Sequence, residues 1–340
     1  MMRLLFVIAV CLHLQCSLIN KKKKDPIQNY LIAFLLSQSA ADSYAKLYQA
    51  SSLLASSPAN TNYLTQVTAA SNTAKKKLIL VHGWQYSDQD NAAIPSDSDL
   101  KQRILTDIWA DVLKTDFYTL VQAKNYELYF FTYLTSSTVD SNGKRFRSVL
   151  DSIFSSESGT VTVFAHSMGG LVTKAAVTES TKPGYITRVI ASGTPFHGSP
   201  WASSAFQQDK KFLGSVAAYM TGTNGGRDLA WDNFDNSLTG ASNAYLSSLN
   251  SKKDRDSLIY AYYGSLDSSG SSYSGSDSTL LTGCSSLGTK YAPSDCIVPQ
   301  ISAISTGNSF AKTQDVGKLA HTDLNLRSGT VRNYLLLDLP

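Results

Sequence analysis

The strongest constraint on the fold of this chain is a serine that lies between a short apolar run and a helix-forming stretch. Ser167 follows the apolar run 161–164 and has Ala165 and Gly169 two positions away on either side. A strand that turns sharply into a helix needs small residues at both positions, because the turn brings its backbone close to the following helix. Such a turn raises the serine hydroxyl above the sheet, where it can act as a nucleophile. The segment therefore predicts a nucleophile elbow.

An earlier strand ends in a second turn that fits the same chemistry. The buried run Leu78–Val81 leads into His82, Gly83 and Trp84. A serine that attacks a carbonyl group needs two backbone N–H groups to hold the negative oxygen, and one of them belongs to the residue after the serine. We therefore predict that Met168 and Trp84 form an oxyanion hole through their backbones. His82 is expected to shape the turn and not to act as a base.

The general base follows from the order of residues along the chain. Enzymes built on this turn carry first their acid and then their histidine after the serine. Of the five histidines, His197 and His321 lie after Ser167. His197 follows the apolar strand Val189–Ala191 so closely that no acid-bearing strand fits before it. His321 is therefore the predicted base.

The acid has two candidates. Asp295 lies in the segment 293–299, and Asp267 lies closer to the end of the predicted strand Leu258–Tyr263. A carboxylate on a loop after a late strand can hold the imidazole in the tautomer that accepts the serine proton. We favour Asp295 and keep Asp267 as its competitor. Three further aspartates fall in an insertion and are expected at the surface or in a lid, namely Asp228, Asp232 and Asp235.

The alternation of apolar runs with helical stretches predicts an α/β fold. Strands are expected at Leu78–Val81, Leu128–Tyr133, Val161–Phe164, Ile186–Ser192 and Leu258–Tyr263. A helix is expected over Leu100–Leu113, where apolar residues share one face and Ser96 and Asp99 can cap the start. These spacings favour a mostly parallel sheet covered by helices. With 43% hydrophobic residues, the chain of 340 residues can bury a large core.

Two segments interrupt this alternation. Residues 201–256 are rich in aromatic side chains and carry a glycine pair that could act as a hinge. We predict that they form a helical lid or cap, the alternative being a helical excursion that packs on the core. Residues 268–290 are rich in serine and glycine, a composition that predicts a flexible loop close to the acid.

The beginning of the chain has the pattern of an export signal. Within residues 1–15, Arg3 precedes an apolar stretch from Leu4 to Leu14, which is too short to span a membrane. Cys16 follows directly and resembles the lipid-modified cysteine of a bacterial lipoprotein. Export is therefore expected, either as a membrane-anchored lipoprotein or by plain secretion.

The charge distribution agrees with a tether followed by a folded domain. Five of the 30 basic residues, Arg3 and Lys21–Lys24, precede all 26 acidic residues, so the rest of the chain is nearly neutral despite the net charge of +4. This balance argues against nucleic acid as a partner. Residues 16–74 are expected to form a lipoprotein-type linker and an N-terminal helical segment, and residues 75–340 the main domain. The lysine run would favour an anionic membrane surface.

The two remaining cysteines predict a disulfide. Once the signal region and Cys16 are set aside, only Cys284 and Cys296 are left. An even pair in an exported chain favours one bridge over two free thiols, which are the alternative. The bridge would hold the loop that carries Asp295.

Taken in order, four segments resemble the secreted bacterial triacylglycerol lipases and esterases of the α/β-hydrolase superfamily: His82-Gly83, Ala165–Gly170, Gly193–Ser199 and Ser294–Pro299. The acid loop matches the family's Ser/Asn-Asp-Gly-x-Val pattern except that Cys296 replaces the glycine. The likeness covers residues 75–200 and 257–340. It implies serine-dependent hydrolysis of acylglycerol-type or related lipid esters with no required cofactor, and it supports Asp295 over Asp267.

The same resemblance brings a metal site and several related activities. The larger bacterial lipases hold a structural Ca²⁺ with an aspartate two residues after the catalytic histidine, which is Asp323 here. A second ligand would come from Asp277 or Asp267. Ca²⁺ takes about six to eight oxygen ligands, so these positions are a partial match. Phospholipases, polyester depolymerases and acyltransferases use the same three catalytic groups, and a surface lipoprotein could keep the fold for binding alone.

Overall fold

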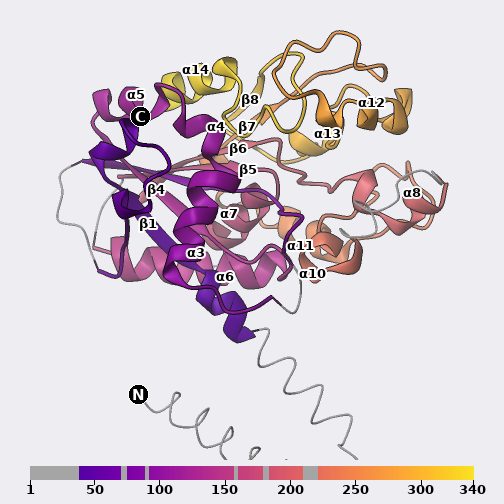
Figure 1. The fold of residues 1–340 in the computed structure, drawn as a ribbon. Helices are drawn as coiled ribbons and strands as arrows, with labels where there is room; N and C mark the ends of the chain where they lie inside the picture. Colours follow the sequence, from indigo (N-terminus) through magenta and orange to yellow (C-terminus); the bar gives the residue numbers. More distant parts are fainter. Residues whose placement is uncertain (1–37, 70–74, 89–91, 157–159, 179–183, 210–220) are drawn as a thin grey trace, which may run out of the picture. The chain divides into compact units, whose positions relative to one another are not determined.

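Eight strands of the described residues form one sheet in the order β2-β1-β4-β3-β5-β6-β7-β8 (Figure 1). The structure is a computed structural model that describes residues 38–69, 75–88, 92–156, 160–178, 184–209 and 221–340. The six strands β3 to β8 run parallel to one another, whereas β1 is antiparallel to both β2 and β4. The strands are β1 (Lys46–Ala50), β2 (Leu64–Gln66), β3 (Lys76–Val81), β4 (Tyr126–Thr132), β5 (Val161–His166), β6 (Ile186–Ser192), β7 (Ile259–Tyr263) and β8 (Lys312–Asp315).

The five strands expected from the sequence are present as β3 to β7, and three others were not foreseen. β8 has the polar sequence Lys-Thr-Gln-Asp and buries none of its residues, so hydrophobic alternation does not reveal it. β1 and β2 correct the prediction that residues 16–74 form a linker and a helical segment. Residues 38–44 are helical, but Leu47 and Tyr48 are buried in β1 between β2 and β4. The main compact unit accordingly begins at Ala40 and not at residue 75.

The central strands are covered on both faces because their side chains alternate between two cores. In β3, Ile79 and Val81 pack in one core with α6 and α7, whereas Leu78 and Leu80 pack in the other with α5 and α14. Burial on both faces explains why these strands are almost continuously apolar. The helices are α3 (Asp97–Gln102), α4 (Ala110–Leu113), α5 (Phe117–Ala123), α6 (Val139–Phe154), α7 (Met168–Thr178), α8 (Ser204–Asp209), α10 (Asn224–Arg227), α11 (Ala244–Ser251), α12 (Thr282–Leu287), α13 (Gln300–Ala303) and α14 (Gly329–Asp338).

The helix predicted over Leu100–Leu113 is present in three pieces. Ser96 and Asp99 form the expected capping box, so α3 begins at Asp97. The chain then winds as a π-helix over Arg103–Ile108, and Trp109 breaks the helix before α4. The apolar periodicity is the same for all three pieces, which explains why the sequence pattern reads as one helix. Short 3₁₀ turns connect other elements: η1 (Ser52–Ala55), η2 (Thr61–Tyr63), η4 (Pro200–Ala202), η5 (Asp256–Leu258), η6 (Ser278–Leu280) and η7 (Thr289–Tyr291).

The aromatic insertion contributes a separate small core. Phe206 and Trp231 from the insertion pack with Leu287 and Tyr291, which lie at the end of α12 and in η7. The insertion therefore rests against the chain segment that leads to Asp295. In Figure 1, α8 and α10 lie together at one end of the ribbon, beside α11.

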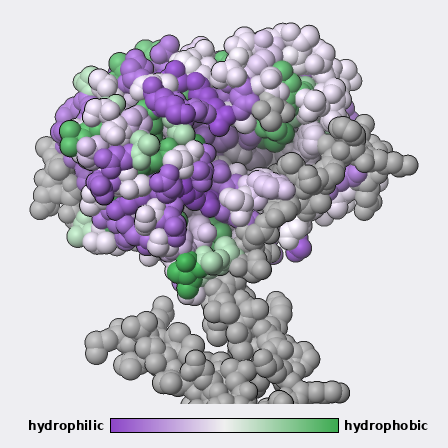
Figure 2. Space-filling view, viewed as in Figure 1, coloured by the Kyte–Doolittle hydropathy of each residue, from purple (hydrophilic) through white to green (hydrophobic). Residues whose placement is uncertain are grey.

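The described part of the chain has no helix long and apolar enough to cross a membrane. The predicted export signal 1–15 and Cys16 lie outside the described residues. On the face shown in Figure 2, hydrophobic patches are small and separated by hydrophilic surface.

Candidate active site

Ser167 lies in the sharp turn that the sequence predicts. It connects β5 to α7 with a backbone φ of +54°, a conformation that residues other than glycine rarely adopt. Its N–H donates to the carbonyl of Ser192, 2.9 Å away, which holds the turn to β6. A Cβ on Gly169 would lie 2.5 Å from the carbonyl oxygen of His82, so only glycine lets α7 approach the neighbouring strand end.

The structure brings Ser167, His321 and Asp295 together in one hydrogen-bonded set. His321 Nε2 lies 2.8 Å from Ser167 Oγ, and His321 Nδ1 lies 2.7 Å from Asp295 Oδ2. The carboxylate accepts from Nδ1–H, which leaves Nε2 to accept the serine proton. All three side chains are buried, with exposed fractions of 7% for Ser167 and His321 and 1% for Asp295.

Hydrogen bonds within its own loop fix the carboxylate of Asp295 in place. Asp295 Oδ1 accepts from the N–H groups of Ile297 at 3.0 Å and Val298 at 2.6 Å. The backbone N–H of His321 donates to the Asp295 carbonyl at 2.9 Å. Asp295 and His321 are thus joined through both backbone and side chain.

The competing acid lies elsewhere. Asp267 is exposed, and its Oδ1 accepts from the N–H and hydroxyl of Ser269. These hydrogen bonds lower the pKa of the Asp267 carboxyl. The structure therefore brings Asp295, and not Asp267, to the histidine.

Two aspartates of the insertion form hydrogen bonds or ion pairs that the sequence did not predict. Asp232 is expected at the surface or in a lid, but its buried carboxylate lies 2.7 Å from His197 Nδ1. Asp228 accepts from the N–H of Val139 at the start of α6, and burial raises its pKa to about 6. These two residues correct the surface assignment, because tertiary contacts cover side chains that a polar local sequence presents as exposed.

Two backbone N–H groups are available beside Ser167. Among the described residues, neither Trp84 N–H nor Met168 N–H has a hydrogen-bond partner. Met168 begins α7, so its N–H belongs to the unpaired donors of a helix start. The predicted oxyanion donors are thus free to bind a ligand oxygen.

His166 has a contact that sequence reasoning missed. Its Nε2 lies 2.9 Å from the carbonyl oxygen of His321 and donates to it, which ties the strand end to the histidine loop. Burial, and then the nearby His321, hold the pKa of His166 well below its ordinary value, so this imidazole stays neutral. Its position directly before the nucleophile was the only available signal.

A cavity of about 260 Å³ opens onto Ser167 and His321. Leu229 from the insertion and Leu280 from the Ser/Gly-rich loop form part of its wall. The insertion therefore borders the site, as a lid or cap would. The other lining residues are Trp84, Gln85, Asp107, Ile108, His166, Ile297, Thr322, Asn325 and Arg327.

The disulfide joins Cys284 and Cys296, the predicted pair. Cys296 adopts a φ of +72°, in the left-handed region that favours glycine. The family pattern that the acid loop resembles has glycine at this position, and the cysteine here adopts a backbone shape that glycine adopts readily. The bridge lies directly beside Asp295.

Asp323 and Asp277, two of the residues proposed to bind Ca²⁺, already have protein partners. Both oxygens of Asp323 already accept hydrogen bonds, Oδ2 from the Tyr273 hydroxyl at 2.8 Å and Oδ1 from the N–H and hydroxyl of Ser276 at 2.9 Å. Asp277 forms an ion pair with Arg327. A cation would have to displace these donors and lie beside a guanidinium. In the part of the chain that the structure covers, no group of three or more His, Cys, Asp or Glu residues is arranged to hold a metal.

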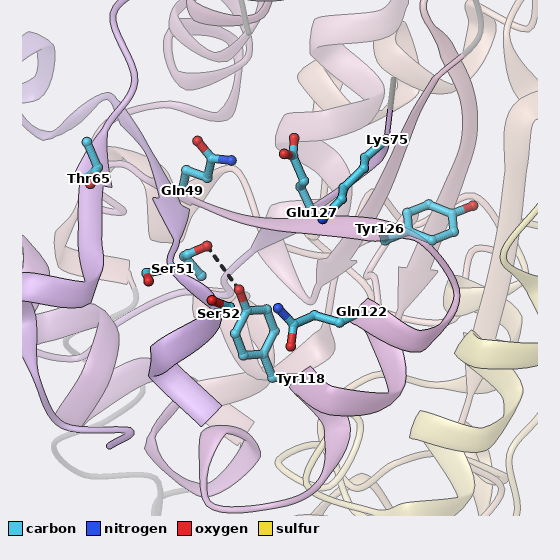
Figure 3. Close-up of a pocket in the computed structure, with 10 residues that line it drawn as sticks. Gln49, Ser51, Ser52, Thr65, Lys75, Tyr118, Gln122, Tyr126 and Glu127 are labelled. Carbon is cyan, nitrogen blue, oxygen red and sulfur yellow. Dashed lines mark hydrogen bonds between the residues drawn. The ribbon is translucent and has the colours of Figure 1, made fainter. Parts of the chain in front are cut away.

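A second cavity, of about 340 Å³, lies at the amino ends of the parallel strands, away from Ser167 (Figure 3). The hydroxyl of Tyr118 donates to the carbonyl of Ala50 at its rim. Glu127 and Lys75, at neighbouring strand starts, both line this cavity (Figure 3). None of its lining residues is a histidine or a cysteine.

Comparison with known proteins agrees with this architecture. Residues 75–222 match the family model described as a PGAP1-like alpha/beta domain. The mature form of the Bacillus licheniformis lipase BlEst2 is similar in structure, with a TM-score of 0.52, 18% identity and coverage of 80% of this chain and 94% of that one. Its propeptide form gives a TM-score of 0.52 and 19% identity, covering 81% of this chain and 52% of that one. No curated protein matches the chain by sequence.

The parallel order of β3 to β8, the strand–Ser167–helix turn and these likenesses lead to one conclusion. The chain has the α/β-hydrolase fold, and its residues 75–222 match the model of a PGAP1-like alpha/beta domain.

Proposed function

We propose that this protein is a serine carboxylic-ester hydrolase of the lipase and carboxylesterase type. The observation that carries the proposal is the position of His321, which lies within hydrogen-bond distance of both Ser167 Oγ and Asp295 Oδ2. A serine, a histidine and a buried carboxylate in this order form the catalytic unit of acyl transfer on several unrelated folds. The fold similarity to the Bacillus licheniformis lipase BlEst2 supports it.

The proposed reaction proceeds through an acyl-enzyme. Ser167 Oγ attacks the ester carbonyl carbon while His321 Nε2 takes the serine proton. The carbonyl oxygen becomes negative and is held by the N–H groups of Trp84 and Met168. Collapse of this intermediate breaks the bond to the alcohol, which leaves with the proton from His321. Water then attacks the acyl-enzyme by the same route and releases the carboxylic acid and Ser167.

Asp295 has a supporting part in both half-reactions. Its carboxylate stays ionised and holds His321 in the orientation and tautomer that accept the serine proton. The transient positive charge on the imidazolium is stabilised by this neighbour. No metal ion or organic cofactor has a part in the scheme.

The cavity favours a lipid-like ester with one acyl chain in the site. Its apolar wall includes Leu229, Leu280 and Ile297, and its volume of about 260 Å³ is at the small end of ligand sites. The rest of the lining includes the polar and charged residues Asp107, Asn325 and Arg327. An acylglycerol or related ester, with an apolar acyl group and a polar alcohol, matches both.

Covalent labelling tests the proposal. A fluorophosphonate probe should label the purified wild-type protein and fail to label Ser167→Ala, while the exposed-serine control Ser155→Ala should label normally. Absence of labelling in folded wild-type protein would refute the hydrolase and favour a binding protein that keeps the fold. A series of p-nitrophenyl esters from short to long chains then measures the acyl preference. Phospholipid and polyester substrates, and acyl transfer to added alcohols, test the related activities.

We further propose that the protein is exported and tethered to a membrane through Cys16. The apolar stretch after Arg3 and the cysteine pair at 284 and 296 support export. Intact-mass analysis of the mature protein should show cleavage before Cys16 and a lipid adduct that Cys16→Ser lacks. Cleavage at another residue with no adduct would indicate plain secretion.

A further inference from the structure

A cluster of buried polar groups holds the turn that follows β3. Thr135 Oγ1 accepts from the backbone N–H of Gln85 at 3.0 Å. The same hydroxyl donates to Asp88 Oδ2 at 2.7 Å, and the Thr135 N–H donates to that oxygen at 2.7 Å. The Asp88 N–H closes the turn by donating to the Gln85 carbonyl at 3.1 Å. Thr135 thus connects both ends of the turn 85–88 to the segment after β4.

Arg103 completes this cluster from the π-helix. Its two terminal nitrogens donate to Asp88, one to Oδ1 at 2.5 Å and the other to Oδ2 at 2.9 Å. Asp88 is 1% exposed, so a carboxylate without these donors would be a buried unpaired charge. A two-point contact of guanidinium with carboxylate fixes direction as well as distance. The turn is therefore held by both Thr135 and Arg103.

The turn 85–88 also orients the peptide unit that joins Gly83 to Trp84. The Gly83 carbonyl accepts from His82 Nδ1 at 2.8 Å and from Gln85 Nε2 at 3.2 Å. In a trans peptide the N–H points away from the carbonyl of the same unit. With the Gly83 oxygen held by two donors, the Trp84 N–H is directed to the opposite side, where none of the described residues accepts from it.

The Gly83 backbone also has no freedom to shift. A Cβ at this position would lie 2.9 Å from both His166 Nδ1 and Ser167 Cβ. The Tyr133 hydroxyl donates to the His82 carbonyl at 2.7 Å, and the Tyr133 ring stacks on His82. These contacts set the turn against the nucleophile on one side and against β4 on the other.

We infer that Thr135, Asp88 and Arg103 are positioning residues that aim the Trp84 N–H at the oxyanion of the reacting ester. The inference rests on the hydrolase proposed above. An oxyanion donor acts by being in place before charge develops, and loss of one such donor costs about 10²–10³ in kcat. Misplacement of a donor costs less than its removal. Thr135 is the clearest test, because its side chain touches the turn and none of the three reacting residues.

Thr135→Val removes the hydroxyl at almost unchanged size. We expect kcat for a p-nitrophenyl ester to fall roughly 10- to 100-fold while KM changes less than about threefold. The affinity for a trifluoromethyl ketone, which binds as a tetrahedral oxyanion, should fall by the same factor as kcat/KM. Thr135→Ser, which keeps the hydroxyl, should restore most of both. All rates are referred to the active fraction titrated with fluorophosphonate.

Thr132→Val is the matched control. Thr132 is as deeply buried, three residues earlier, and its hydroxyl donates to the carbonyl of Tyr44 at 2.7 Å and not to the turn. It should lose comparable stability and keep kcat within about twofold. A Thr135→Val enzyme with wild-type kcat and wild-type ketone affinity would overturn the inference, and so would equal losses in Thr132→Val.

Hydrogen exchange separates this inference from the proposed function. Amide exchange in a peptide spanning 83–88 should become faster in Thr135→Val and stay unchanged in Thr132→Val. If wild-type protein hydrolyses no ester and takes no label, the hydrolase is refuted, yet faster exchange would still show that Thr135 holds the turn. Unchanged exchange in Thr135→Val would refute the positioning role in either case.

Discussion

Asp295 reaches His321 with one carboxylate oxygen, at 2.7 Å from Nδ1, while its other oxygen accepts two backbone N–H groups of its own loop. The acid is therefore oriented independently of the histidine. This division of its two oxygens gives the first prediction.

Asp295→Asn should lower kcat by about 10⁴, because an amide presents a donor to Nδ1 and favours the wrong imidazole tautomer. Steady-state kinetics on a p-nitrophenyl ester measure the effect. Asp267→Asn is the matched control and should change kcat by less than twofold. Wild-type activity in Asp295→Asn, or a large loss in Asp267→Asn, would transfer the acid to Asp267.

Breaking the disulfide should reduce stability in a way that depends on the residue at 296. Cys284→Ala/Cys296→Ala should lower the free energy of unfolding by about 3 kcal/mol, the order expected for closing a short loop. Cys284→Ala/Cys296→Gly should recover about 1 kcal/mol of this loss, because φ at 296 is +72°. Urea unfolding of both variants gives the comparison, and equal stabilities would contradict the backbone argument.

A fully buried ion pair behind Ser167 should be sensitive to loss of one partner. Lys174 Nζ lies 2.9 Å from Asp256 Oδ1, and the side chains are 0% and 1% exposed. Lys174→Met should lower the free energy of unfolding by about 3–5 kcal/mol, because it leaves Asp256 buried and unpaired. The double variant Lys174→Met/Asp256→Leu should be closer to wild type. The single variant Asp256→Leu completes the comparison. If the double variant loses as much free energy of unfolding as Lys174→Met and Asp256→Leu lose together, the two residues are not coupled.

Asp228 should make the stability depend on pH in the acid range. Its pKa is raised to about 6 by burial, above its ordinary value of 3.8, so the folded chain binds the proton more tightly than the unfolded chain. The resulting contribution is complete below about pH 4 and is lost as pH rises through about 6. Asp228→Asn, which can still accept from Val139 N–H, should therefore be more stable than wild type at pH 7 by about 1–3 kcal/mol. Thermal unfolding at pH 4 and pH 7 measures this difference, which should nearly vanish at pH 4.

Chelation should leave the protein unchanged. Asp323 is occupied by Tyr273 and Ser276, and Asp277 by Arg327, so a calcium ion has no free carboxylate pair to bind. Activity and unfolding temperature should be the same in EDTA and in millimolar Ca²⁺. A rise in the unfolding temperature with Ca²⁺ that Asp323→Asn abolishes would establish a calcium site.

The central strands and the nucleophile could be predicted because their signals are local. β3 to β7 are buried on both faces and read as apolar runs. The elbow needs small residues at fixed distances from Ser167, since a Cβ on Gly169 in α7 would lie 2.5 Å from the carbonyl oxygen of His82. β2 and β8 were not foreseen because they are short edge strands with exposed residues, and β1 because it is a short inner strand of five residues. Pairing with a neighbour, not their own composition, makes them strands.

The order of residues along the chain also selected His321, but order alone left two acids. Asp267 and Asp295 both follow the same strand, β7, and only the folded path of the loop shows which one faces the imidazole. The disulfide of Cys284 with Cys296 and the β-bridge of Leu266 with Ser294 set that path. Contacts of this kind have no regular spacing along the sequence, so hydrophobic periodicity does not predict them.

By itself, the sequence determined the sharp turn around Ser167. A strained backbone restricts the residues next to it to small ones, and these small residues can be recognised in the sequence. The tertiary structure decided what surrounds the turn: His166 at the carbonyl of His321, Asp232 at His197, and Thr135 with Asp88 behind Trp84. Each of these pairs joins residues far apart in the chain. Their free energy depends on burial that only the complete fold supplies.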